Sequence, residues 1–117
     1  MDYTPYIKKL RERKAQEKTL AEHKRQQALS AAQEIANALK RDFFARRVIL
    51  FGSTLSLQRF HSRSDIDIAV AGIPSHKFFS AHSRALDIAK HFNIDLVDLK
   101  ACRPALSAKI EAEGMEL

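Results

Sequence analysis

A long segment without glycine or proline constrains this chain more than any other feature. After Pro5, no further glycine or proline occurs before Gly52. Residues 5–41 are rich in Ala, Leu, Lys, Glu, Gln and Arg, which all have high helix propensity. Thr4-Pro5 is typical of a helix start, because Pro is favoured directly after an N-cap residue. We therefore predict one long helix, with a break near Leu29-Ser30 as the alternative; unbroken, it would extend about 55 Å.

The two halves of this helix differ in their apolar character. In the second half, apolar residues recur at helical spacing and predict a face that packs on the rest of the protein: Ala28, Ala32, Ile35, Ala36 and Leu39. Between Tyr6 and Lys24 apolar residues are sparse, so burial alone cannot hold this half in place. We predict that residues 1–28 form a basic helical arm that projects or packs on another chain, either a partner or a second copy. Residues 29–117 are predicted to form one domain.

The positive charge of the chain is concentrated in its N-terminal region. The formal net charge is +6; residues 1–47 contain 12 Lys and Arg against 6 Asp and Glu, whereas residues 48–117 contain 8 of each kind. A basic arm can contact nucleic acid, an acidic protein surface or only solvent. Because acidic residues interrupt the basic ones and no aromatic stripe accompanies them, we do not expect nucleic acid to be the main partner.

Three observations concern the compartment of the protein. No apolar run approaches the ~20 residues needed to cross a membrane. The N-terminus lacks the apolar core of a signal peptide. Cys102 is the only cysteine, which excludes an internal disulfide. Together these features predict a cytoplasmic protein without a membrane partner.

The second half of the chain alternates apolar strand-like and helix-like segments. The predicted strands are Arg47–Phe51, Asp65–Ala71 and Asn93–Leu99, and the predicted helices run from Ser75 to about His91 and from Pro104 to Gly114. The apolar face of the first of these helices is predicted to contain Phe78, Phe79, His82, Leu86, Ala89 and Phe92. This order predicts an α/β or α+β fold, in which helices flank a small mixed sheet and a long helix precedes it.

Two aspartates lie on one of the apolar strands. Side chains alternate along a strand, so Asp65 and Asp67 point to the same face while Ile66 and Ile68 point to the other. Carboxylates in apolar surroundings repel each other and are costly to bury when ionised. A hard cation removes this cost, and Mg²⁺ prefers oxygen ligands and substrate phosphates. The pattern therefore predicts a magnesium site at Asp65 and Asp67.

A turn and a third carboxylate complete the candidate site. Gly52 and Ser53 follow a strand, where glycine allows a sharp turn close to a ligand and the amides at a helix start can bind a phosphate. Asp95 lies in the apolar segment NIDLVDL and is predicted to join the metal site and activate an attacking hydroxyl. Asp98 ranks lower, because it points to the opposite face from Asp95.

The segments LFGS, SDIDIAV and IDLVDL together resemble the minimal nucleotidyltransferases of the DNA-polymerase-beta superfamily. The resemblance covers about residues 29–117. The family signature is Gly-Ser, a spacer of ten residues, Asp-x-Asp and a later Asp, and it is matched by Gly52, Ser53, Asp65, Asp67 and Asp95. The spacer here has eleven residues, and the first basic residues after the turn are Arg59 and Arg63 rather than an earlier Arg. The resemblance implies that these two arginines contact the triphosphate.

The resemblance also implies a polymerase-beta-type fold and transfer of AMP from ATP, with Mg²⁺, to an acceptor. Chains this small resemble antitoxins that pair with a HEPN-type ribonuclease toxin and adenylylate one of its tyrosines. Larger relatives carry a second domain, so a partner or a second copy is expected to complete the pocket here. Two alternatives are an antitoxin that acts by binding alone, with a decayed transferase site, and a nucleic-acid-binding protein that uses the basic arm.

Overall fold

The glycine- and proline-free segment forms one continuous helix, α1 (Thr4–Asp42). The computed structural model describes residues 2–56, 58–61 and 65–117. The predicted alternative of a break near Leu29-Ser30 is wrong: the helix continues through both residues, and Leu29 packs against the core. Among the residues that the structure describes, no helix is long and apolar enough to span a bilayer.

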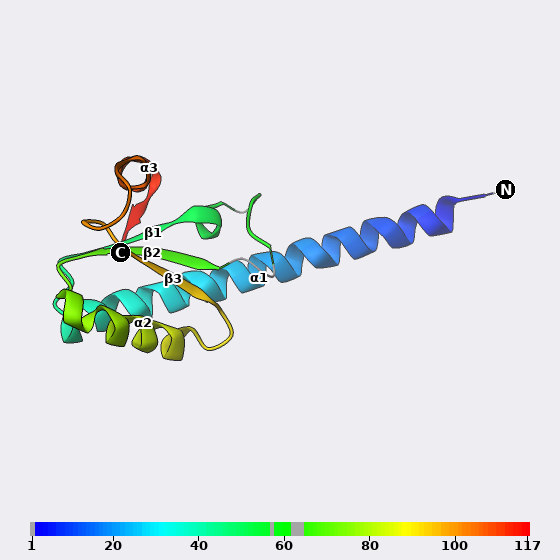
Figure 1. Cartoon of the computed structure of the whole chain (residues 1–117). Coiled ribbons are helices and arrows are strands. Elements are labelled where there is room, and N and C mark those ends of the chain that lie inside the picture. The colour runs from blue at the N-terminus through cyan, green and yellow to red at the C-terminus, as the bar shows by residue number, and fades with distance from the viewer. Residues whose placement is uncertain (1, 57, 62–64) are drawn as a thin grey trace.

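A four-stranded sheet forms the centre of the remaining chain (Figure 1). In chain order, the elements after α1 are β1 (Arg47–Phe51), the 3-10 turn η1 (Gly52–Leu55), β2 (Ile66–Ala71), α2 (Ser75–Ala89), β3 (Ile94–Asp98), α3 (Pro104–Glu113) and β4 (Met115–Glu116). The strand order is β3-β2-β1-β4, with β2 and β3 parallel and the other two pairs antiparallel. The predicted small mixed sheet with flanking helices is confirmed.

The two faces of the sheet have different coverings. On one face, α1 and α2 pack against alternate strand residues such as Val48, Leu50 and Ile68, and together they form the main core. The predicted packing face of α1 is confirmed, because Ala28, Ala32, Ile35, Ala36 and Leu39 are all fully buried. On the other face, Ile110 of α3 packs with Ile49 of β1 and Ala69 of β2, in a second and smaller core. The end of this face that carries Asp65 and Asp95 is more open, because both residues are exposed.

The N-terminal half of α1 projects beyond the sheet (Figure 1). The molecule measures 66 × 29 × 18 Å along its principal axes, and the helix accounts for the long dimension. Tyr6, Leu10 and Leu20 are all exposed on this half. The first fully buried residue of α1 is Ala28, so burial in the main core begins there.

Two elements differ from the sequence-based expectation. The fully buried residues of α2 are small: Ala81, Ala85 and Ala89. Of the predicted apolar face, Phe78, Ala89 and Phe92 pack in or against the main core, whereas Phe79 is 80% exposed and Leu86 is 41% exposed. Small side chains let α2 approach α1 and the sheet closely, so the helix faces them with its alanines. The short strand β4 was not predicted, because two residues carry no periodic signal; it forms by pairing with β1.

Candidate functional site

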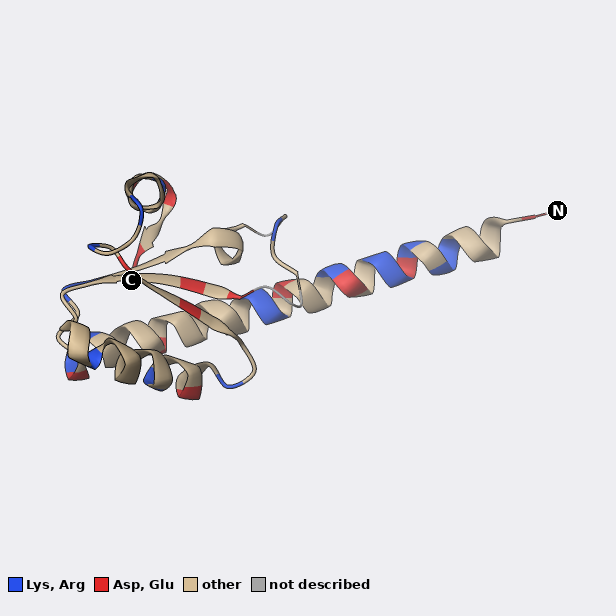
Figure 2. Cartoon of the chain, viewed as in Figure 1, with Lys and Arg blue, Asp and Glu red and all other residues tan. Residues whose placement is uncertain are grey.

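The strand register brings two of the predicted carboxylates together. Asp67 of β2 is paired with Phe51 of β1 on one side and with Asp95 of β3 on the other. Paired residues on neighbouring strands lie about 5 Å apart and point to the same face. Asp65 immediately precedes β2, two residues before Asp67. Figure 2 shows the acidic segments of β2 and β3 side by side at one end of the sheet.

The carboxylate of Asp67 is under electrostatic strain. Burial, followed by the negative charges of Asp95 and Asp65, raises the pKa of Asp67 from 3.8 to about 6. Asp67 is half-buried, whereas Asp65 and Asp95 are exposed. Within the described ranges, no ion pair involves Asp67 or Asp95. A cation at this place would favour the ionised form of Asp67, and the three carboxylates offer the oxygen ligands that Mg²⁺ prefers.

The carboxylates of Asp65, Asp67 and Asp95 do not point to one common metal position in this structure. Among the described residues, no group of three His, Cys, Asp or Glu side chains is already arranged as a set of metal ligands. Mutual repulsion favours such a separation, because like charges gain by turning apart. Binding of one cation by all three aspartates would therefore require side-chain rotation. The chemistry of these residues fits Mg²⁺, and their backbone positions bring at least Asp67 and Asp95 within reach of one ion.

Gly52 brings the backbone directly against this acidic group. Its φ of +81° lies in the left-handed region that favours glycine, and it joins β1 to η1. A Cβ atom at this position would lie 2.2 Å from Oδ2 of Asp67. The turn after β1 is therefore in contact with the Asp67 carboxylate only because residue 52 has no side chain.

The helix that starts at Gly52 is a single short turn. Ser53 is half-buried in η1, a 3-10 turn of four residues rather than an α-helix. A single turn has no substantial macrodipole, so a phosphate here would depend on individual backbone and side-chain donors. Gly52 and Ser53 therefore start a helical turn, as predicted, but it is a 3-10 turn; both residues lie at the same end of β1 as the partner of Asp67.

A cavity of about 230 Å³ opens beside Gly52. Its apolar wall combines residues of β1, η1 and α3, and its polar residues include Ser56, Arg59 and Lys109. Arg59 therefore lines a cavity that adjoins the acidic group, whereas Arg63 lies outside the described residues. Lys109 carries no sequence signal for this site, because α3 is far along the chain and has no motif that relates it to the turn.

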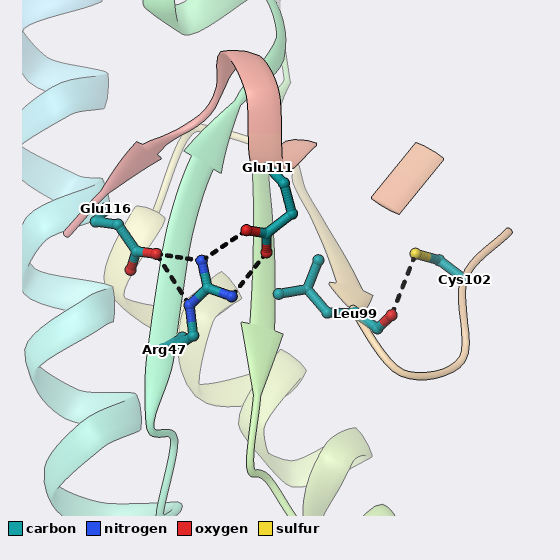
Figure 3. A network of polar contacts seen from close by, with 5 residues as sticks. All are labelled: Arg47, Leu99, Cys102, Glu111 and Glu116. Carbon is teal, nitrogen blue, oxygen red and sulfur yellow. Dashed lines mark hydrogen bonds and ion pairs between the residues drawn. The ribbon is translucent and has the colours of Figure 1, made fainter. Parts of the chain in front are cut away.

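A network of ion pairs holds the α3 side of this cavity in place (Figure 3). Arg47 of β1 donates hydrogen bonds to Glu111 of α3, with an Nη1–Oε1 distance of 2.7 Å, and to Glu116 of β4. These contacts raise the pKa of Arg47 and lower that of Glu111. They anchor α3 and β4 to the strand that ends at Phe51.

Asp98 has a local structural role in the turn after β3. Its Oδ1 accepts a hydrogen bond from the backbone N–H of Lys100 at 2.9 Å. Asp98 is paired with Val70, three positions along the ladder from the Asp67–Asp95 pair, and so points to the other face of the sheet. The site therefore contains Asp95 rather than Asp98.

Comparisons with known proteins agree with this geometry. A family model described as "Polymerase beta, Nucleotidyltransferase" matches residues 33–117, which include every candidate site residue. No curated protein sequence matches significantly. A solved toxin–antitoxin structure with AMP-PNP is 26% identical, with a TM-score of 0.60, over 73% of this chain and 70% of that chain.

Two further solved structures share the fold at lower identity. The toxin–antitoxin MntA–HepT is 22% identical, with a TM-score of 0.57, over 75% of this chain and 69% of that chain. A tri-AMPylated Shewanella oneidensis HEPN toxin in complex with its MNT antitoxin gives 22% identity and a TM-score of 0.56, over 76% of this chain and 70% of that chain. The family match covers most of the chain and the sheet has the same architecture, so this chain belongs to the polymerase-beta nucleotidyltransferase family.

Proposed function

We propose that this chain transfers AMP from ATP to a tyrosine hydroxyl of a partner HEPN-type toxin and thereby acts as its antitoxin. The observation that carries the proposal is the pairing of Asp67 with Asp95 beside Gly52, where the pKa of Asp67 is raised to about 6. The family match supports nucleotidyl transfer. The relative that is 26% identical was solved with AMP-PNP, an ATP analogue, which supports ATP as the nucleotide.

The proposed reaction needs two kinds of group from this chain. The acceptor oxygen attacks the α-phosphorus of ATP, the new P–O bond forms, and the bond to the bridging oxygen of pyrophosphate breaks. Asp95 is proposed to accept the hydroxyl proton, because it is exposed on the open face of the sheet and can reach an acceptor there. Gly52, Ser53, Arg59 and Arg63 are proposed to contact the phosphates, with pyrophosphate leaving toward the cavity that Arg59 lines.

Asp65, Asp67 and Asp95 are the residues proposed to hold Mg²⁺. When bound, the ion would neutralise phosphate charge and orient the α-phosphate for in-line attack. Asp67 is the central ligand in this proposal, because it is the most buried of the three and is flanked by the other two. Its carboxylate is held against Gly52, which would place the ion beside the phosphate-contacting turn.

A protein acceptor fits the open side of the site. Asp65 and Asp95 are exposed, and neither belongs to the cluster of buried residues under α3. A HEPN-type toxin is the proposed acceptor, because a solved relative of the same fold is an MNT antitoxin bound to a tri-AMPylated HEPN toxin. The partner would supply the wall that covers β2 and β3.

A second candidate function is neutralisation by binding alone. The single 3-10 turn after Gly52 and the late position of the first arginine favour it, since both reduce the donors available to a triphosphate. In this case the acidic group would be a remnant of a transferase site. The two candidates share the partner and differ in whether AMP is transferred.

The test uses the purified chain, a HEPN-type toxin as acceptor, and Mg-ATP labelled on either the α- or the γ-phosphate. We expect label from the α-phosphate to enter the partner and label from the γ-phosphate not to do so. Asp67→Asn should abolish transfer, whereas Asp87→Asn, the same change on an exposed position of α2, should not. Neutralisation of the toxin without label, and equally by Asp67→Asn, would favour binding alone.

A further inference from the structure

One contact links α1 to the turn that begins at Gly52. Arg25 donates a hydrogen bond from Nε to the backbone oxygen of Thr54 at 2.8 Å and one from Nη2 to the backbone oxygen of Leu55 at 3.3 Å. Arg25 lies less than one helical turn before Ala28, the first fully buried residue of α1. It also lies outside residues 33–117, the part that matches the family.

The contact reaches the last two carbonyl groups of η1. An isolated 3-10 turn is weak, because its hydrogen bonds are poorly aligned and few. The guanidinium group is planar and presents its donors in a fixed fork, so two adjacent carbonyls on one such group are held in a defined orientation. Within the described part of the chain, Arg25 has no carboxylate at ion-pair distance, so its charge is directed to these carbonyls.

The same turn is joined to the acidic strand. Thr54 is fully buried, and its Oγ1 donates to the backbone oxygen of Asp65 at 3.4 Å. At the other end of the turn, Gly52 touches the carboxylate of Asp67. Movement of η1 would therefore displace both the backbone beside Asp65 and the backbone against Asp67.

We propose that Arg25 is a positioning residue for the nucleotide: it holds η1 in the conformation that contacts the phosphates. The expected effect on nucleotide binding rests on the proposed function, whereas the ordering of the turn by Arg25 can be measured without nucleotide. Helix α1 supplies a rigid anchor, because Ala28, Ala32 and Ile35 fix it against the sheet. Arg25 thus joins a weak turn to a helix that is anchored in the main core, across 29 positions of sequence.

Loss of this anchor should weaken nucleotide binding without unfolding the domain. The apparent affinity of a ligand falls by the fraction of molecules in the competent conformation. If the released turn spends about one tenth of its time in that conformation, the dissociation constant rises about tenfold. Binding of Mg²⁺ alone should change less, because Asp67 and Asp95 are held by the strand ladder rather than by η1.

The experiment measures two quantities in the full chain. The first is hydrogen exchange of the Ser56 amide without nucleotide, which reports the turn because this N–H donates to the Ser53 oxygen at 3.1 Å. The second is the dissociation constant of Mg-AMP-PNP, determined by calorimetry well below the melting temperature. Arg25→Ala should accelerate the exchange and raise the dissociation constant about tenfold.

Two control variants separate positioning from general effects. Arg11→Ala removes the same charge from an exposed position of the same helix, and should change neither quantity. Ile73→Val removes a methylene from the main core outside α1 and η1, and should lower the melting temperature but leave the affinity unchanged.

The inference is overturned if Arg25→Ala leaves the Ser56 exchange at the parent rate, or if Ile73→Val weakens AMP-PNP binding as much as Arg25→Ala does. If the parent chain binds no AMP-PNP even with its partner present, the proposed function fails, and the exchange measurement still decides whether Arg25 orders the turn. Faster exchange with unchanged affinity would show that the turn takes no part in nucleotide binding, and would also overturn the inference.

Discussion

Replacing Asp67 with Asn should stabilise the metal-free protein at neutral pH. The pKa of Asp67 is raised from 3.8 to about 6 by burial and by the charges of Asp95 and Asp65, so its ionisation disfavours the folded state. Each pKa difference of one corresponds to about 1.4 kcal/mol, which gives about 3 kcal/mol for the whole difference. Asp67 is only half-buried, and solvent screening reduces the expected gain to about 1–2 kcal/mol.

The pH dependence of this gain follows from the sign of the shift. Below about pH 4, Asp67 is protonated in both the folded and the unfolded state, and the parent and Asp67→Asn should be nearly equal in stability. As the pH rises from about 4 to 6, the unfolded chain loses the proton first, so the parent loses stability. Above about pH 6 the difference should be constant and at its maximum.

The assay is urea denaturation followed by circular dichroism between pH 4 and about 8, with and without Mg²⁺. At ten times its dissociation constant, Mg²⁺ should stabilise the parent by about 1.4 kcal/mol and should stabilise the variant much less. Asp87→Asn is the matched control, and its stability relative to the parent should not change in this way with pH or Mg²⁺. A variant that is less stable than the parent at pH 7.5 without Mg²⁺ would refute the reasoning, since the Asp67 carboxylate would then be a structural hydrogen-bond acceptor.

Three further changes test other parts of the structure. Gly52→Ala should destabilise the fold by at least about 1–2 kcal/mol, because φ is +81° and the new Cβ would meet the Asp67 carboxylate; unchanged urea stability would contradict this. At pH values above 4.5, Arg47→Ala should slightly lower the melting temperature. The difference should shrink in acid, because Glu111, whose pKa Arg47 lowers, then becomes protonated. Deleting residues 2–20 should leave the melting temperature unchanged and reduce assembly size or partner binding in light scattering, because these side chains are exposed; an unfolded core would disprove it.

The helical and strand segments could be predicted largely from local patterns. The continuous helix α1 follows from the absence of glycine and proline between Pro5 and Gly52, and its packed face follows from the spacing of Ala28, Ala32 and Ile35. Such patterns work because helix and strand periodicities relate residues only a few positions apart. The placement of Asp67 on the opposite face of its strand from the buried Ile66 and Ile68 is of the same kind, although Asp65 lies just before the strand rather than on it.

Other features depended on contacts between distant parts of the chain. The orientation of α2 about its own axis buries Ala85 and exposes Phe79. It depends on how closely α2 can approach α1, which the hydrophobicity along one helix does not specify. The two residues of β4 form a strand only by hydrogen bonding to the edge of β1 that β2 leaves unpaired.

The candidate site shows the same division most clearly. Sequence alone identified Asp67 and Asp95 as acids on apolar strands, but the parallel register that makes them neighbours required the assembled sheet. The contact of Arg25 with the turn after Gly52 had no sequence signal, since no periodicity relates residues 29 positions apart. Local backbone geometry determines which residues can share a face, whereas long-range packing determines which faces meet and with what register.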